Sequence, residues 1–206
     1  MKVKNEEIDL LPLDQFHGKV LVVDSPDKFA EAIAQLRQQS LLGFDTETRP
    51  TFTRGVSHRV ALLQLSTDST TWLFRLNIIG LPPELADIMS DDKITKVGLA
   101  IRDDLKALRR RRDFTPRGCF DVQTMASAEG IEDLGLKKLA ARVLGVRISK
   151  RQRLTNWENP TLTAQQIDYA ATDSWVSLLM YLAIKDGKTL HPRYIEAQKE
   201  VASIQS

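Results

Sequence analysis

Apolar residues gather in five short segments that are rich in valine, isoleucine, leucine and threonine, a pattern typical of β-strands. The predicted strands are residues 19–23, 41–46, 59–66, 70–76 and 93–98. Only residues 67–69 separate the third strand from the fourth, and their Thr-Asp-Ser sequence suits a tight turn. These two strands are therefore expected to form a hairpin.

Elsewhere apolar residues recur every three or four positions, which is the period of an amphipathic α-helix. The predicted helices begin near residues 26, 83, 101, 121, 136 and 163. Thr163 and Gln166 form a capping box at the start of the longest helix, which runs through Leu182, and Gly145 stands where a C-cap glycine belongs. Strands interleaved with helices predict an α/β fold with a mixed sheet.

The composition is that of an ordinary globular protein. The chain has 206 residues, 42% of them apolar, and a net charge of only +2, so a nucleic-acid partner is permitted but not required. A single cysteine, Cys119, excludes a disulfide framework and a cysteine zinc site and fits a reducing compartment. There is no hydrophobic signal-peptide region and no long apolar run. We therefore expect no membrane contact and a cytoplasmic (intracellular) location.

The first candidate chemistry lies at the end of the second predicted strand. Asp45 and Glu47 are two residues apart, so their side chains point to the same face. Two adjacent carboxylates repel each other unless a cation joins them or one takes a proton. Mg²⁺ or Mn²⁺ would resolve this conflict, since both prefer oxygen ligands. A polar strand end without a metal is the alternative interpretation.

Two further acidic segments lie on predicted helices. Tyr169 and Asp173 are four residues apart and share a helix face, either in a functional site or as a hydrogen-bonded pair that holds the helix in place. Asp103 and Asp104 follow Gly98 in the first turn of another helix, where acids also stabilise the helix N-terminus without further function. Taken singly, none of these segments decides between the two interpretations.

Together the segments resemble the DEDDy branch of the 3′→5′ exonucleases, which includes ribonuclease D and the exonuclease domain of the Werner syndrome helicase. The resemblance covers roughly residues 20–185 and rests on an acid pair, an Asp-Leu-Lys turn and a Tyr-x-x-x-Asp sequence in the family's order. The matching stretches are FDTET at 44–48, RVALLQLS at 59–66, VGLAIRDDLKAL at 97–108, LKKLAARVLG at 136–145, and NW followed by LTAQQIDYAATD within 156–173.

The resemblance implies a ribonuclease H-like (DEDD exonuclease) fold, with a mixed five-stranded sheet flanked by helices. It places an exonuclease domain at 19–186, after an N-terminal extension at 1–18 and before a C-terminal tail at 187–206. Asp104 is preferred to Asp103 because the family's helix continues as Asp104-Leu105-Lys106 does. The catalytic residues that it implies are Asp45, Glu47, Asp104, Tyr169 and Asp173.

The implied reaction hydrolyses nucleic acid from its 3′ end and releases nucleoside 5′-monophosphates. Asp45, Glu47 and Asp173 are expected to hold one of two divalent ions, Mg²⁺ or Mn²⁺, and Asp45 to bridge to the second, about 3.5–4 Å away. Asp104 belongs to this metal set, with orientation of bound water as its expected role. Tyr169 is expected to aim the attacking water.

The expected partner is single-stranded or 3′-ended DNA or RNA, and no protein partner can be deduced. The basic loop before the longest helix supplies candidate phosphate contacts, Lys150 and Arg153. Thr46 is a candidate contact through its backbone. Trp157 is expected either to stack on a base or to anchor the core. The arginines at 109–112 either stabilise a helix end or bind phosphate.

Two other functions are compatible with parts of this pattern. A catalytically weak or inactive adaptor of the same fold would bind nucleic acid without cutting it, although all five expected catalytic positions are present here. A phosphohydrolase acting on nucleotides or small phosphates would use similar carboxylates. Such an enzyme would not need Tyr169 four residues before Asp173.

Overall fold

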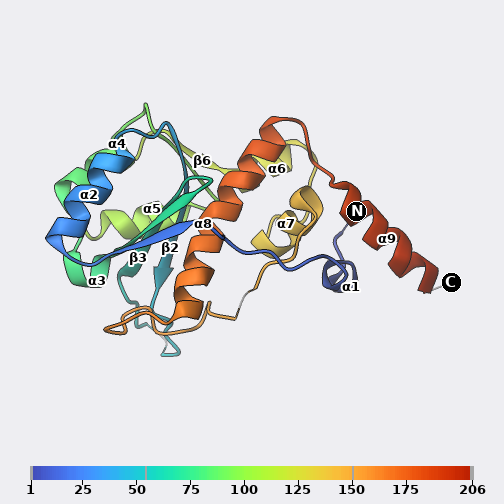
Figure 1. The fold of residues 1–206 in the computed structure, drawn as a ribbon, viewed down its shortest axis with the longest axis horizontal. Coiled ribbons are helices and arrows are strands. Elements are labelled where there is room, and N and C mark those ends of the chain that lie inside the picture. Colours follow the sequence, from blue (N-terminus) through green and yellow to red (C-terminus); the bar gives the residue numbers. More distant parts are fainter. Residues whose placement is uncertain (1, 54, 150, 205–206) are drawn as a thin grey trace.

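The computed structural model describes residues 2–53, 55–149 and 151–204, and its centre is a mixed sheet between two layers of helices (Figure 1). The sheet order is β1-β4-β3-β2-β5-β6. Its strands are β1 Lys19–Val23, β2 Leu41–Thr48, β3 Val60–Ser66, β4 Thr70–Arg75, β5 Thr95–Gly98 and β6 Cys119–Asp121. β3 runs antiparallel to both of its neighbours, and the other neighbouring strands are parallel. The predicted mixed sheet and the predicted hairpin are therefore confirmed.

The expected number of five strands is corrected to six. The additional strand, β6, has only three residues and pairs in parallel with β5 at the edge of the sheet. Three residues are too few to show an alternating pattern, and Phe120 within them is exposed. Nothing in the local sequence marks this segment as a strand, so the pairing with β5 is what defines it.

Nine helices are present in the described residues, and the six predicted ones are among them. They are α1 Asn5–Asp9, α2 Pro26–Leu36, α3 Leu76–Ile79, α4 Pro83–Ser90, α5 Arg102–Arg109, α6 Val122–Ala128, α7 Leu136–Leu144, α8 Ala164–Lys185 and α9 Pro192–Ile204. The capping box of Thr163 and Gln166 forms as predicted, and Gly145 ends α7 in the left-handed conformation. Within the described residues, no helix is both long and apolar enough to cross a membrane.

The two faces of the sheet are covered by different helices. Leu42, Phe44 and Leu63 point into one core with the apolar residues of α2, α4 and α5. α8 crosses the opposite face, where Tyr169 and Ala170 pack against side chains of β3 and β4 (Figure 1). Because strand residues alternate between faces, Asp45 and Glu47 lie on the α8 side of β2.

Helix α8 approaches β2 so closely that only glycine fits beneath it. A Cβ atom at Gly43 would lie 2.1 Å from the backbone oxygen of Ser174. Beside this contact, the Ser174 hydroxyl lies 2.5 Å from the Ser66 hydroxyl of β3, which in turn lies 2.8 Å from Thr71 of β4. A glycine gap and a chain of buried hydroxyls thus fix the height and register of α8 over the sheet.

The two ends of the chain lie on the same side of the molecule, where α1 and α9 pack together (Figure 1). The buried Tyr194 hydroxyl of α9 donates to the Glu7 carboxylate of α1 at 2.5 Å. Ile8, Tyr194 and Ala197 form a small apolar cluster with Ala141 of α7. The segments expected as an N-terminal extension and a C-terminal tail therefore form one helical addition beside α7.

Substitution of Gly43 by alanine should destabilise the fold by about 3 kcal/mol, because the added methyl group meets the backbone of α8 rather than a movable side chain. Gly135→Ala is the matched control, since no atom lies within 4 Å of a Cβ at that position. Urea unfolding of both variants tests this. Equal stability of the two would show that α8 shifts without cost.

Candidate active site

The first two acids stand on adjacent same-face positions of β2. In the ladder with β3, Asp45 lies opposite Gln64 and Glu47 lies opposite Leu62. A bulge follows between Glu47 and Thr48, where the strand departs from regular pairing. The alternation predicted from the sequence therefore brings both carboxylates toward α8.

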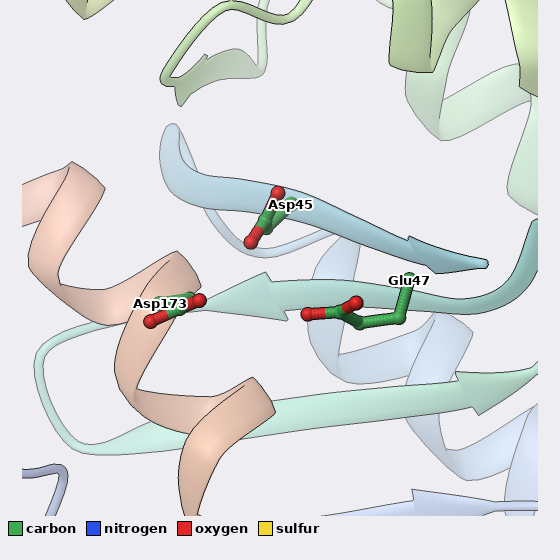
Figure 2. Close-up of side chains that lie close together, drawn as sticks. All are labelled: Asp45, Glu47 and Asp173. Carbon is green, nitrogen blue, oxygen red and sulfur yellow. The ribbon is translucent and has the colours of Figure 1, made fainter. Parts of the chain in front are cut away.

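Helix α8 supplies the third acid. Asp173 faces Asp45 and Glu47 across the gap between α8 and the sheet (Figure 2). One carboxylate oxygen from each of the three residues lies within 4.8 Å of the others. Glu47 and Asp173 are buried and Asp45 is half-buried. Three acidic side chains from two distant segments, β2 and α8, thus meet at one largely buried point.

Burial and mutual repulsion strongly disfavour the charged forms of these acids. Burial is the main reason why the pKa of Asp45 is raised well above its ordinary value, with Asp173 and Asp104 adding repulsion. The pKa of Glu47 is raised to about 10, again mainly by burial and then by Asp45 and Asp173. Without a cation, the cluster therefore holds protons at neutral pH. A divalent ion with oxygen ligands suits this donor set and would displace them.

Asp104 lies near this cluster but is not a member of the three-carboxylate group found in the described residues. It sits in the first turn of α5, half-buried, and accepts a hydrogen bond of 2.5 Å from the Thr46 hydroxyl. Thr46 lies between Asp45 and Glu47 and points to the opposite face of β2. Asp103 is exposed, so of the two candidate acids Asp104 is the one that the fold turns toward the site.

The turn from β5 into α5 has an unusual backbone that aims Asp104. Ala100 has a φ of 58°, a left-handed conformation that non-glycine residues seldom adopt. Its N–H donates to the Asp121 carboxylate at 3.0 Å, and the same carboxylate oxygen caps α6 through the N–H of Gln123. Asp121, which stands at the predicted start of a helix, therefore also holds this turn.

Tyr169 lies one helical turn before Asp173 and is hydrogen-bonded to it, so the predicted contact within the helix forms. Burial and the nearby carboxylates Asp173 and Glu47 raise the pKa of Tyr169 above its ordinary value. The phenol is therefore protonated throughout the physiological range, and its single O–H is the donor in the hydrogen bond to Asp173.

Trp157 is fully buried and packs against Tyr169, with ring centroids 6.0 Å apart. Its stacking on a base is therefore contradicted, because no part of the ring reaches solvent, and the anchoring alternative holds. The buried Arg75 of β4 donates to the carbonyls of Asn159 and Pro160, which fixes the segment that follows Trp157. The sequence marks Arg75 only as a strand residue, so this anchor was not predicted.

The basic loop borders the acidic cluster. Arg153 is exposed, yet its charge lowers the pKa of Glu47, which places it near that carboxylate. Arg147 and Arg151 line a neighbouring pocket of about 390 Å³ together with Lys137, and the acids Asp9, Asp14 and Asp168 line it as well. Lys150 lies outside the described residues. Of the described loop residues, Arg153 is therefore the positive charge that acts on the carboxylate cluster.

The arginines at the end of α5 have mainly structural roles. Arg111 donates to the carbonyl of Val60 at 2.5 Å, and Arg112 donates to that of Leu81 at 2.6 Å. Arg109 pairs with Asp113 on the surface. Arg111 and Arg112 thus join the end of α5 to carbonyls of β3 and of the turn before α4, a structural role other than the predicted stabilisation of the helix end.

Replacing Glu47 with glutamine should stabilise the metal-free protein at neutral pH. The folded protein keeps a proton on Glu47 up to about pH 10, whereas the unfolded chain releases it near 4.5, so the wild type loses stability as pH rises between these values. The neutral amide avoids this loss. Thermal unfolding in EDTA at pH 5 and pH 8 should show a melting temperature several degrees higher for E47Q at pH 8 only.

Added Mn²⁺ should give the wild type the higher melting temperature of the two proteins, because the ion stabilises the wild type and binds E47Q weakly. A lower melting temperature for E47Q than for the wild type in EDTA at pH 8 would contradict this account of the carboxylate cluster.

The sequence also matches known proteins. The family model described as 3′-5′ exonuclease covers residues 20–186. A curated relative, exonuclease 3′-5′ domain-containing protein 2 of Drosophila melanogaster, is 32% identical over 166 residues, which cover 78% of this chain and 28% of that protein. The 3′-5′ exonuclease of Arabidopsis thaliana is 29% identical over 85% of this chain and 66% of its own length. The chain thus spans less than two thirds of these relatives.

Solved structures support the same fold. The EXO domain of Nibbler from Aedes aegypti aligns with a TM-score of 0.77 and 24% identity, covering 84% of this chain and 91% of that domain. This confirms the ribonuclease H-like fold expected from the sequence. Since the family model matches most of its length, the chain belongs to the 3′-5′ exonuclease family.

Proposed function

We propose that this protein is a metal-dependent 3′→5′ exonuclease of the DEDDy type, which releases nucleoside 5′-monophosphates. The observation that carries the proposal is the meeting of Asp45, Glu47 and Asp173 within 4.8 Å, beside the hydrogen-bonded Tyr169. Membership of the exonuclease family supports it. A structural role alone does not account for three acids held together at such electrostatic cost.

Asp45, Glu47 and Asp173 would hold a divalent ion, Mg²⁺ or Mn²⁺, and Asp45 would also contact a second one. When bound, such ions lower the pKa of water and neutralise charge on the scissile phosphate. Asp104 would act from the opposite face of β2, with Thr46 fixing one of its oxygens and leaving the other for an ordered water. This role agrees with its position outside the three-carboxylate group.

Tyr169 would orient the attacking water. Its raised pKa keeps the hydroxyl protonated, with its hydrogen donated to Asp173, so the phenol oxygen would accept a hydrogen bond from the water, and we assign it positioning rather than proton removal. Its hydrogen bond to Asp173 and its packing on Trp157 restrain the phenol from two sides. Because the ring cannot swing away freely, the water that it holds would keep a fixed direction of attack.

The substrate would be single-stranded or 3′-ended DNA or RNA. Arg153 would neutralise a phosphate beside the carboxylates, and the pocket with Arg147 and Arg151 would receive the adjoining strand. Thr46, with its hydroxyl committed to Asp104, would offer only its backbone to the terminal nucleotide. A structural neighbour, ribonuclease D of Trypanosoma brucei, was solved in complex with RNA U12, which supports a polynucleotide ligand.

Asp45→Asn should lower the rate of hydrolysis by about a thousandfold or more, since one metal-binding carboxylate is lost. The assay is digestion of 5′-labelled DNA and RNA oligonucleotides with Mg²⁺ or Mn²⁺, resolved as a ladder that shortens from the 3′ end. Asp103→Asn is the matched control because this neighbouring acid is exposed, and it should keep wild-type activity.

Binding of the oligonucleotide without any shortening by the wild type would show an adaptor instead of a nuclease. Release of phosphate from free nucleotides, with intact oligonucleotides, would show a phosphohydrolase of a different class.

Arg153→Ala should raise the KM for a 12-nucleotide substrate by about tenfold, because one phosphate contact near Glu47 is lost, and should flatten the salt dependence of KM. Arg37→Ala removes the same charge from an exposed position at the end of α2, in the helix layer on the other face of the sheet, and should leave KM unchanged. Equal effects of the two substitutions would indicate a general charge effect and no local phosphate contact.

A further inference from the structure

Gln64, in the middle of β3, is fully buried, and neither its Nε2 nor its Oε1 has a hydrogen-bond partner among the residues that the structure describes. Burying a carboxamide without partners is unfavourable, because water satisfied both atoms in the unfolded chain. Ser66, two residues along the same face of β3, is also fully buried but contacts two other hydroxyl groups. The unpaired amide is therefore a local exception within a satisfied polar row.

The ladder places Gln64 next to the acidic cluster. Gln64 lies directly opposite Asp45 in the antiparallel pairing of β2 with β3. Residues opposite each other in such a ladder project to the same face with Cβ atoms about 5 Å apart. The carboxamide and the Asp45 carboxylate are thus neighbours on the face covered by α8.

Helix α8 encloses Gln64 from above at the level of Asp173. Leu62, two residues before Gln64, clusters with Ala170 of α8, and Ser66, two residues after it, contacts Ser174. The part of α8 above Gln64 is therefore the turn between Ala170 and Ser174, which carries Asp173. Gln64 lies beneath the carboxylate cluster, where an unpaired donor has acids for neighbours.

We propose that Gln64 is a positioning residue of the metal site, whose Nε2–H donates to Asp45 when a divalent ion holds that carboxylate in its charged form. This inference rests on the proposed function. Carboxylates that bind metals are commonly fixed by hydrogen bonds to their remaining lone pairs. An amide suits this place because a lysine or arginine would compete with the ion, while another acid would add to the repulsion.

The test is Gln64→Met, which keeps the length and most of the volume of the side chain but removes the amide. Mn²⁺ binding, measured by calorimetry, should weaken by about tenfold. Stability in EDTA should stay the same or rise, since an unsatisfied polar group is replaced by an apolar one. In oligonucleotide digestion, kcat should fall while KM stays constant.

Leu65→Val is the matched control on the neighbouring position of β3, whose side chain packs into the core on the opposite face. It removes buried apolar contacts away from α8, so it should lower stability in EDTA and leave Mn²⁺ affinity at the wild-type value. One variant should lose Mn²⁺ affinity and the other should lose stability. This difference distinguishes a residue that positions the metal site from one that supports the fold.

Wild-type Mn²⁺ affinity in Gln64→Met would overturn the proposal, as would a loss of affinity that merely follows a loss of stability. A wild-type protein that binds no Mn²⁺ would overturn it as well. Absence of hydrolysis by a wild type that does bind Mn²⁺ would contradict the proposed exonuclease function alone, because the affinity comparison does not depend on turnover.

Discussion

The close approach of α8 to β2 is the contact on which the rest of the site depends. Gly43 provides the gap, since any side chain there would meet the backbone of Ser174. Ser174 lies next to Asp173 in the chain, so the contact that sets the height of the helix also sets the distance from Asp173 to β2. Asp45 is two residues from Gly43 on the same face of the strand. A glycine with an ordinary backbone conformation thus determines how near two carboxylates come.

The short distance between these carboxylates opposes folding unless other interactions compensate for it. The raised pKa values of Asp45 and Glu47 show that the fold disfavours the charged forms of both groups. Apolar packing of α8 through Ala170 and Tyr169, and the hydroxyl row through Ser174, supply the opposing stabilisation. The scaffold therefore holds a site whose most stable metal-free form is protonated. Binding of a cation and release of those protons belong to one equilibrium.

Much of this architecture could be predicted because it depends on local periodicity. Asp45 and Glu47 share a face through the two-residue repeat of a strand, and Tyr169 meets Asp173 through the four-residue spacing of a helix. What escaped prediction depends on pairing between distant segments. β6 becomes a strand only through β5, the segment after Trp157 is held by Arg75 of β4, and α1 is held by Tyr194 of α9. A single sequence does not reveal which distant segments contact each other, or in which register.

The position of Asp104 illustrates how the strand organises chemistry on both of its faces. Asp45 and Glu47 turn toward α8, while Thr46 between them turns toward α5 and donates to Asp104. Asp104 therefore approaches the end of β2 from the opposite helix layer. Its carboxylate accepts a hydrogen bond from the Thr46 hydroxyl, which lies between it and the other acids. Asp104 contributes to the raised pKa of both Asp45 and Glu47 from this separate position. The proposed role of Asp104 in ordering water rests on this position, in which Thr46 orients its side chain outside the three-carboxylate group.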